Sequence, residues 1–444
     1  MKKESVTFFA QMMNEVLGTT NILVFENLGL IHASPDMDPW TLALQYLPEK
    51  LKKYVQLIPG DILVTNDIAL GNCKGNEIAI VHCQTVAGIR FYIGTKLILP
   101  RSCDLRIPPC ILERTGKVET GILEALAASA PQGLPIRNLL ISAFSSIRLA
   151  ADHLKRLHET KLIQLEDKEI RSYLRHCTEV SENLVELLPF DEATTQMTLE
   201  GNRNLQMQLK HLDTGVELDL RGTGGGLSTT DRIGLTADQT QSVLLWTLGK
   251  LLRWPCYNVG LFSTITLSKP QGTWVSQTQL QNPDFMEIGR AALSKSLELV
   301  FKAVTKKALP TLAFPFPIEI LFQANANSYQ LNFCELSQEW GQELDSRMKI
   351  NQIEKEIPVL TISLTSQNQN KSRAVSASFQ ALQNFKMQLK YEPGTHKPGL
   401  VSGAWAKSRV ELSRKGSRKA IQSGDFDVNE GDLIFITTGH GYSH

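Results

Sequence analysis

Apolar residues recur every three to four positions in several long stretches of the chain, and this spacing predicts helices. The stretches are 5–17, 40–55, 119–187, 236–254 and 284–309. The first is followed by Gly18, which suits the left-handed backbone just beyond a helix C-terminus. The last two are followed by Pro255 and Pro310, and proline cannot continue a helix.

Other stretches alternate apolar and polar residues or form short apolar runs, which predicts β-strands. These stretches are 20–32, 62–65, 77–99, several segments from 195 to 222, and several more from 316 to 439. A hairpin turn at Val86-Ala87-Gly88-Ile89 is expected to divide the 77–99 stretch into two strands. The polar segment 367–374 is expected to be a surface loop.

These elements predict an α+β fold of several domains, with antiparallel or mixed sheets and packed helices. A chain of 444 residues has room for roughly two to four domains. Changes in the pattern separate an N-terminal α/β region (1–190), a central β-meander with helices (191–310) and a C-terminal β-rich region (311–444).

Charge and hydropathy exclude some classes of partner. The chain has 46 basic and 45 acidic residues, so its net charge of +1 gives no electrostatic reason to expect binding to nucleic acid or an anionic membrane. No run approaches the roughly 18 apolar residues of a transmembrane helix. Acidic residues at Glu4 and Glu15 argue against a secretory signal at the start. We therefore expect a cytoplasmic protein with no nucleic-acid and no membrane partner.

The cysteines are more consistent with packing than with chemistry. There are seven, scattered along the chain without a CxxC pair. This pattern argues against a disulfide framework and against a four-thiolate zinc site. We expect free and mostly buried thiols, because an unpaired cysteine packs like a small apolar residue.

A glycine-rich segment, LDLRGTGGG at 218–226, lies between a predicted strand and a predicted helix. Backbone amides in such a loop can bind phosphate. The spacing matches neither GxxxxGK[ST] nor GxGxxG, however, and about ten residues separate the glycines from the helix. The pattern therefore favours a turn or a closely packed loop.

The segment PGDILVTNDIALGNCKGNEIAI, residues 59–80, is the best candidate for a functional site. A short apolar strand ends at Asn66 and Asp67, and a glycine-containing loop leads to the next strand. A carboxylate at a strand end can bind a metal ion or act as a general base. The alternative for Asp67 is an Asx turn that closes the strand.

Several motifs, in the same order along nearly the whole chain, resemble the hydantoinase B/5-oxoprolinase family. TTNILVFENLG (19–29) resembles the N-terminal SxNIxERxDFS pattern, and residues 59–80 resemble PGDxxxxNDPYxGGTHLPDIxx. LDLRGTGGG lies where the family has xDFTGSxxQ, and the C-terminal GDFDVNEGDLIFITTGHGYSH resembles xxxLxPGDxxxxxTPGGGGYG. Relatives of this family also form part of acetone and acetophenone carboxylases.

The resemblance implies a hydantoinase B-like subunit of a heteromeric complex. The partner would be an A-type subunit that binds ATP and activates a cyclic amide such as a hydantoin or 5-oxoproline for hydrolysis. In the family, the B-type subunit holds a divalent metal such as Zn or Mn. Its ligands are the Asp of ERxDFS, the His and Asp of GGTHLPD, and a His in a later RAHH segment.

Carried over residue by residue, the resemblance implies that this metal site is degraded. Asn66 and Asp67 match the Asn and Asp of NDPY, but Lys74 stands at the expected histidine and Glu77 at the expected aspartate. The other two ligand positions fall near Asn27 and within Lys96–Ile98. We take Asp67 and Glu77 as the catalytic candidates and expect no metal.

One other metal site remains open. Cys73, Glu77 and His82 could bind a metal together if the loop and the following strand bring them into contact.

Two hypotheses follow for function. The chain is either a subunit that takes part in cyclic-amide hydrolysis with an ATP-using A-type partner, or a non-catalytic structural or regulatory relative, a pseudoenzyme, in such a complex. A third hypothesis is that only the fold is shared and the function differs.

Overall fold

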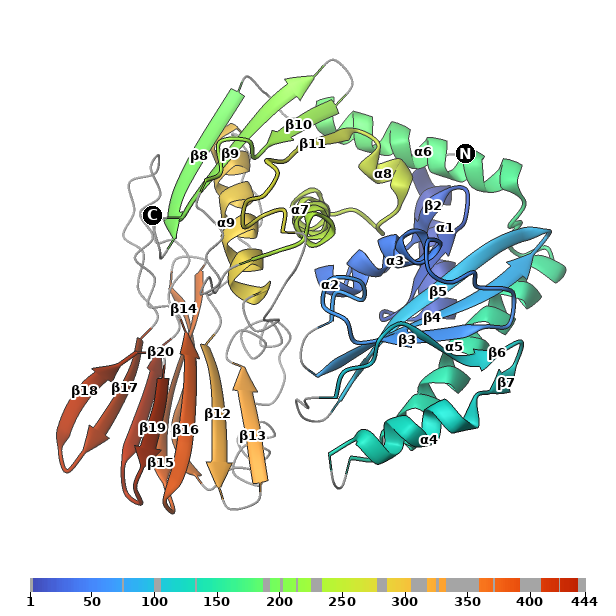
Figure 1. The fold of residues 1–444 in the computed structure, drawn as a ribbon. Helices are drawn as coiled ribbons and strands as arrows, with labels where there is room; N and C mark the ends of the chain where they lie inside the picture. Colours follow the sequence, from blue (N-terminus) through green and yellow to red (C-terminus); the bar gives the residue numbers. More distant parts are fainter. Residues whose placement is uncertain are drawn as a thin grey trace.

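The computed structural model describes residues 3–73, 76–99, 105–131, 134–186, 192–199, 203–212, 215–224, 234–277, 286–304, 318–324, 327–332, 359–369, 372–391, 409–422 and 424–437. Within these ranges the chain forms four β-sheets and associated helices, shown in Figure 1. None of the described helices is long and apolar enough to cross a membrane.

The N-terminal part is built on a seven-stranded sheet in the order β2-β1-β5-β4-β3-β6-β7, with every neighbouring pair antiparallel. Its strands are β1 (Ile22–Phe25), β2 (Gly29–His32), β3 (Ile62–Thr65), β4 (Glu77–Val86), β5 (Ile89–Ile98), β6 (Cys110–Arg114) and β7 (Lys117–Val118). Ala87 and Gly88 form the predicted two-residue turn between β4 and β5, both with positive φ, as a tight hairpin requires.

Helices cover both faces of this sheet. The N-terminal helices are α1 (Lys3–Leu17), α2 (Pro39–Leu42), the 3₁₀ turn η1 (Ala43–Tyr46), α3 (Leu47–Leu51), α4 (Thr120–Ser129), α5 (Ile136–Glu159) and α6 (Asp167–Glu186). On the α5 side, Lys155 donates to Gln84 of β4. On the other side, a Cβ placed at Gly94 of β5 would lie 3.6 Å from Cβ of Leu44 in η1. The sheet therefore separates α5 from the α2–η1 segment.

A second, four-stranded sheet has the order β11-β10-β9-β8, with β10 and β11 parallel and the other pairs antiparallel. Its strands are β8 (Glu192–Leu199), β9 (Arg203–Leu212), β10 (Gly215–Asp219) and β11 (Ile265–Ser268), and its helices are α7 (Ala237–Leu252), α8 (Val259–Phe262) and α9 (Met286–Val304). In Figure 1, α9 lies between this sheet and α7.

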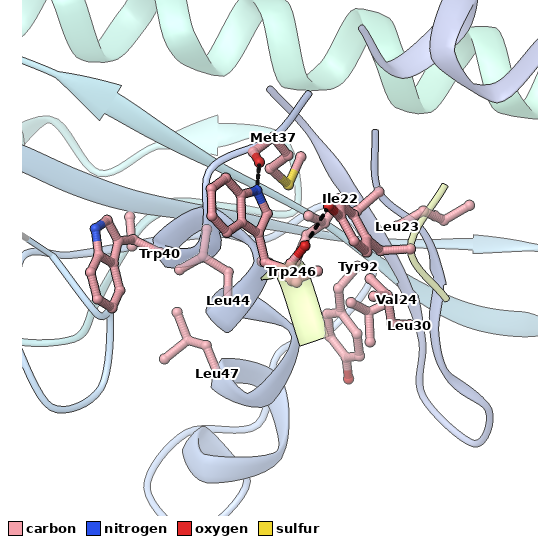
Figure 2. Packing of buried hydrophobic residues seen from close by; sticks show 14 of the residues in the cluster. Ile22, Leu23, Val24, Leu30, Met37, Trp40, Leu44, Leu47, Tyr92 and Trp246 are labelled. Carbon is pink, nitrogen blue, oxygen red and sulfur yellow. Dashed lines mark hydrogen bonds between the residues drawn. The ribbon is translucent and has the colours of Figure 1, made fainter. Parts of the chain in front are cut away.

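α7 begins with a signal that is readable in the sequence. In Thr236-Ala237-Asp238-Gln239, the Thr236 hydroxyl accepts from the backbone N–H of Gln239 and the Gln239 side chain accepts from the N–H of Thr236. Eleven of the sixteen residues of α7 are buried, because α7 packs against α2 and η1 on one side and α9 on the other. Figure 2 shows Trp246 of α7 donating its indole N–H to the carbonyl of Met37, 2.6 Å away.

The C-terminal part consists of two sheets, β13-β12-β16-β19 and β14-β15-β20-β17-β18, in which every described pair is antiparallel. The strands are β12 (Ile318–Ala324), β13 (Asn327–Asn332), β14 (Val359–Gln369), β15 (Ser372–Ala381), β16 (Phe385–Tyr391), β17 (Arg409–Arg414), β18 (Ser417–Ile421), β19 (Gly424–Val428) and β20 (Leu433–Thr437). Buried apolar residues form two clusters, one drawn from Ala10 to Phe301 and one from Ile320 to Ile436.

Two local predictions were wrong. The predicted 40–55 helix is divided into α2, η1 and α3, and it ends at Leu51. Pro48 lies in the first turn of α3, because proline lacks the N–H that a continuous helix would need there. Of the predicted loop at 367–374, residues 367–369 end β14 and residues 372–374 begin β15, and the two strands pair from Val359↔Ala381 to Gln369↔Ser372; residues 370–371 lie outside the described residues.

Candidate functional site

The candidate loop begins at a buried strand that is fixed at both ends. Before β3, Gly60 has φ +97°, and a Cβ there would lie 2.9 Å from Cα of Thr115. After β3, the amide of Asn66 bonds to the 105–107 segment: it donates to the carbonyl of Leu105 (2.5 Å) and accepts from the N–H of Ile107 (2.7 Å). Asn66 therefore has a structural role in holding the segment that leads into β6.

Asp67, a predicted catalytic residue, lies in an exposed position at the start of the loop. Its Oδ1 accepts from the backbone N–H of Ala69 (2.9 Å) and of Leu70 (2.7 Å). These are the bonds of the turn that the sequence offered as the alternative role for this residue. A catalytic role for Asp67 stays a prediction.

The middle of the loop is buried. Asn72 has φ +53°, and its Nδ2 donates to the carbonyl of Ala43 in η1 (3.3 Å). The neighbouring Cys73 thiol is fully buried and lies within hydrogen-bonding distance of the carbonyls of Gly71 (3.4 Å) and Thr65 (3.6 Å). Burial raises the pKa of the Cys73 thiol to about 12, although the positive charge of Lys96 opposes the shift. Cys73 is therefore a neutral thiol at ordinary pH.

Glu77, the second predicted catalytic residue, forms a buried ion pair with Lys96. Lys96 lies opposite Ala79 in the β4–β5 pair, so its side chain shares a sheet face with that of Glu77. The Lys96 ammonium lies 2.7 Å from Glu77 Oε2 and donates to the carbonyl of Asn72 at 2.5 Å. The side chains are 4% and 8% exposed, so the charges are almost fully removed from water.

His82 lies on the opposite face of β4, because Glu77 and His82 are an odd number of residues apart. It packs on the α5 side, where Nδ1 donates to the carbonyl of Asp61 (3.1 Å), and Nε2 is buried without a hydrogen-bond partner. Desolvation lowers the pKa of His82 to about 4.

The alternative metal set of Cys73, Glu77 and His82 is therefore not brought together. Glu77 and His82 are also roughly 16 Å apart along the strand, at about 3.3 Å per residue. In the part of the chain that the structure describes, no three His, Cys, Asp or Glu side chains are placed to hold a metal ion.

Two further residues contact the loop, Lys50 and Gln239, and a third, Asp238, pairs with one of them. Lys50 of α3 donates to the carbonyl of Ala69 (2.9 Å) and forms an ion pair with Asp238 of α7 (2.5 Å). Gln239 of α7 lies 3.5 Å from the carbonyl of Ile68, a longer and weaker contact. The loop thus lies against the N-terminus of α7.

The remaining positions suggested by the resemblance do not add a ligand. Asn27 is exposed in the turn between β1 and β2, and Ile98 is an exposed apolar residue at the end of β5. Lys74 lies outside the described residues, as do residues 225–226 of the glycine-rich segment. Of the glycines that are described, Gly224 pairs with Asn204 of β9, as expected for a closely packed loop.

The described residues do not fit a divalent metal ion at this loop. Glu77, the one carboxylate of the expected set, already accepts from an ammonium group that donates also to the Asn72 carbonyl. A cation bound to the same oxygens would be repelled by Lys96. The Cys73 thiol would first have to lose a proton that burial strongly retains.

Comparison with solved structures identifies the architecture. Over 98% of this chain and 88% of the other, the structure matches ATP-dependent caprolactamase from Pseudomonas jessenii, with a TM-score of 0.74 and 12% identity. Over 99% of this chain and 75% of the other, it matches acetone carboxylase in a nucleotide-free structure, with a TM-score of 0.73 and 9% identity. The chain has the fold of these two enzymes.

No protein-family model matches the sequence, and no curated protein does so either. The structural matches confirm the α+β, hydantoinase B-like architecture that the order of motifs predicted. At 9% and 12% identity they show a shared fold, and the activity of the chain has to be argued separately.

Proposed function

We propose that the chain is a cytoplasmic subunit of a heteromeric, ATP-dependent enzyme that acts on a cyclic amide or a related carbonyl compound. The observation that carries this proposal is the extent of the match to ATP-dependent caprolactamase, which covers 98% of the chain. The second match is also to an ATP-dependent enzyme, again over nearly the whole chain. In the proposal, an A-type partner binds ATP and activates the substrate.

The experiment is reconstitution with an A-type subunit. The two chains are co-expressed, and complex formation is measured by size-exclusion chromatography with light scattering. ATP hydrolysis and ring opening are then assayed with hydantoin, 5-oxoproline and caprolactam. We expect a stable complex in which ring opening requires both chains. A failure to associate, together with ring opening that is unchanged when this chain is omitted, would contradict the proposal.

A second candidate is a non-catalytic structural or regulatory subunit in the same kind of complex. The Lys96–Glu77 ion pair favours it, because it engages the carboxylate expected to take part in metal-assisted hydrolysis. The variants Asp67→Asn and Glu77→Gln distinguish the two candidates. If both variants assemble and retain wild-type ring opening, the chain is non-catalytic. A large loss in kcat with both assembly and Tm intact assigns the chemistry to this loop, because Glu77→Gln also breaks the ion pair with Lys96.

A further inference from the structure

The loop at 67–73 is held by positively charged side chains from two other elements. Lys96 reaches it from β5 and donates to the carbonyl of Asn72, and Lys50 reaches it from α3 and donates to the carbonyl of Ala69. Each lysine therefore bonds to a backbone oxygen of the loop, at 2.5 and 2.9 Å.

Both lysines are bound in the same way. Each ammonium lies between one loop carbonyl and one carboxylate: Lys96 with Glu77 at 2.7 Å, and Lys50 with Asp238 at 2.5 Å. Carbonyl and carboxylate oxygens are the ligands that hard metal cations prefer in proteins. An ammonium group presents its three N–H donors to such oxygens in place of a metal's coordination bonds.

The two pairs connect the loop to different parts of the protein. The first closes the loop onto the β4–β5 hairpin, where both side chains are nearly buried. The second closes it onto the first turn of α7, where Lys50 and Asp238 are 29% and 23% exposed. Water screens the second pair more strongly, whereas removing one partner of the first would leave a buried charge unpaired, so we expect the loss of Lys96 to disturb the loop more than the loss of Lys50.

We propose that Lys96 and Lys50 are built-in cations of the 67–73 loop, which organise it without a divalent metal ion. Because the two ammonium groups are covalently part of the chain, the loop keeps its conformation in the presence of a chelator. The inference stands on the contacts of the loop itself, so it holds or fails independently of the proposed complex and its reaction.

The first test uses the wild-type chain alone. The protein is purified, its Zn and Mn content is measured by mass spectrometry, and its thermal unfolding is followed with and without EDTA. We expect substoichiometric metal and a Tm that EDTA, Zn²⁺ and Mn²⁺ each shift by less than about 1 °C. Stoichiometric metal, or a Tm that falls with EDTA and recovers with either ion, would overturn the proposal.

The second test removes the charges one at a time. Lys96→Met keeps most of the side-chain volume and leaves Glu77 buried without its ammonium, so we expect Tm to fall by roughly 5 °C or more. Limited proteolysis mapped by mass spectrometry should show new cleavage within residues 66–77. Lys50→Met should show the same cleavage at a lower rate.

Lys53→Met is the matched control, because Lys53 is exposed on the same segment as Lys50. We expect this variant to have the Tm and the cleavage pattern of the wild type. If residues 66–77 of Lys96→Met resist proteolysis as well as those of the wild type, the result would contradict the role of Lys96. If Lys96→Met fails to fold, the chelation experiment and Lys50→Met decide the question.

Discussion

His82 donates its Nδ1–H to the carbonyl of Asp61 at 3.1 Å, and this bond fixes the tautomer of a buried imidazole. Its other nitrogen, Nε2, faces the interior with no hydrogen-bond partner. A neutral His82 thus fits this site and a charged one does not, which is consistent with a pKa lowered by desolvation to about 4.

Acid should destabilise the protein below about pH 6.5. The unfolded chain takes up a proton on His82 near the ordinary pKa of 6.5, whereas the folded chain does so only near 4. The unfolded state therefore binds more protons between these values, and stability falls as the pH decreases from 6.5 to 4. The full contribution of His82 is about 3 kcal/mol. Burial lowers the pKa of His32 to about 3, which adds a loss of the same sign.

Urea unfolding at pH 7.5 and 4.5 measures this loss. His82→Gln keeps an N–H donor for the Asp61 carbonyl and removes the titration, so its stability should depend less on pH. An identical difference between the two pH values in His82→Gln and in the wild type would show that His82 does not contribute.

The buried thiols should resist alkylation in the native state. Burial raises the pKa of Cys73, Cys83 and Cys256 to about 12 and that of Cys177 to about 11, and the reactive form is the thiolate. Cys110 is only partly buried. Iodoacetamide labelling at pH 8, followed by peptide mass spectrometry, should modify Cys110 at least tenfold faster than the other four. Equal rates for all five would indicate that the native core opens readily.

The bond from Trp246 to Met37 should make an indole necessary at this position. Trp246→Phe keeps most of the apolar contact but leaves the Met37 carbonyl without its donor, so the free energy of unfolding should fall by about 1–3 kcal/mol. Trp246→Ala also leaves a cavity and should cost about 3–5 kcal/mol. Urea denaturation provides both values. A Phe variant as stable as the wild type would mean that this bond adds nothing.

A pair of substitutions should measure how much the capping box of α7 contributes to the free energy of unfolding. Thr236→Ala removes the acceptor for the N–H of Gln239 and should cost about 1 kcal/mol, whereas Thr236→Ser keeps the hydroxyl and should be close to the wild type. Chemical denaturation of the three proteins tests this. Equal losses for Ala and Ser would point to the methyl group of Thr236 rather than to its hydroxyl.

Two glycines with positive φ differ in their surroundings and form a matched pair. Gly88→Ala should lower the free energy of unfolding by about 1–2 kcal/mol, because an alanine is strained at positive φ. No steric cost is added, since a Cβ there meets nothing within 4 Å. Gly60→Ala should cost clearly more, because its Cβ would also lie 2.9 Å from Cα of Thr115. Thermal or urea unfolding ranks the two variants. The reverse order would contradict the close approach of Gly60 to the β6–β7 turn.

Local signals predicted much of the fold. Apolar spacing over 236–254 predicted α7 and Pro255 predicted its end, and the Thr and Gln three residues apart at its start are a further signal in the sequence. The 40–55 prediction followed apolar spacing and gave too little weight to Pro48. The surface loop at 367–374 was predicted because the segment consists mostly of polar residues. At the end of an antiparallel hairpin, however, polar side chains can continue the backbone pairing, as Gln369 and Ser372 do.

The site was predictable in part. A two-residue turn at Ala87-Gly88 is enough to set Ala79 opposite Lys96, which places Lys96 on the face of Glu77. The sequence therefore contained the signal for this ion pair, because the turn relates the two positions to each other. No comparable signal exists for Lys50 and Asp238, because they meet only when α3 packs beside α7.

The β4–β5 turn also limits how this region can change during evolution. Side chains alternate between the two faces of a strand, so inserting or deleting one residue within β4 after Glu77, or within β5 before Lys96, would turn one of them toward α5 if the rest of the pairing is kept. Two charges would then be buried on opposite sides of the sheet without each other. Length changes within these two strands should therefore be tolerated only in steps of two, or together with the loss of both charges.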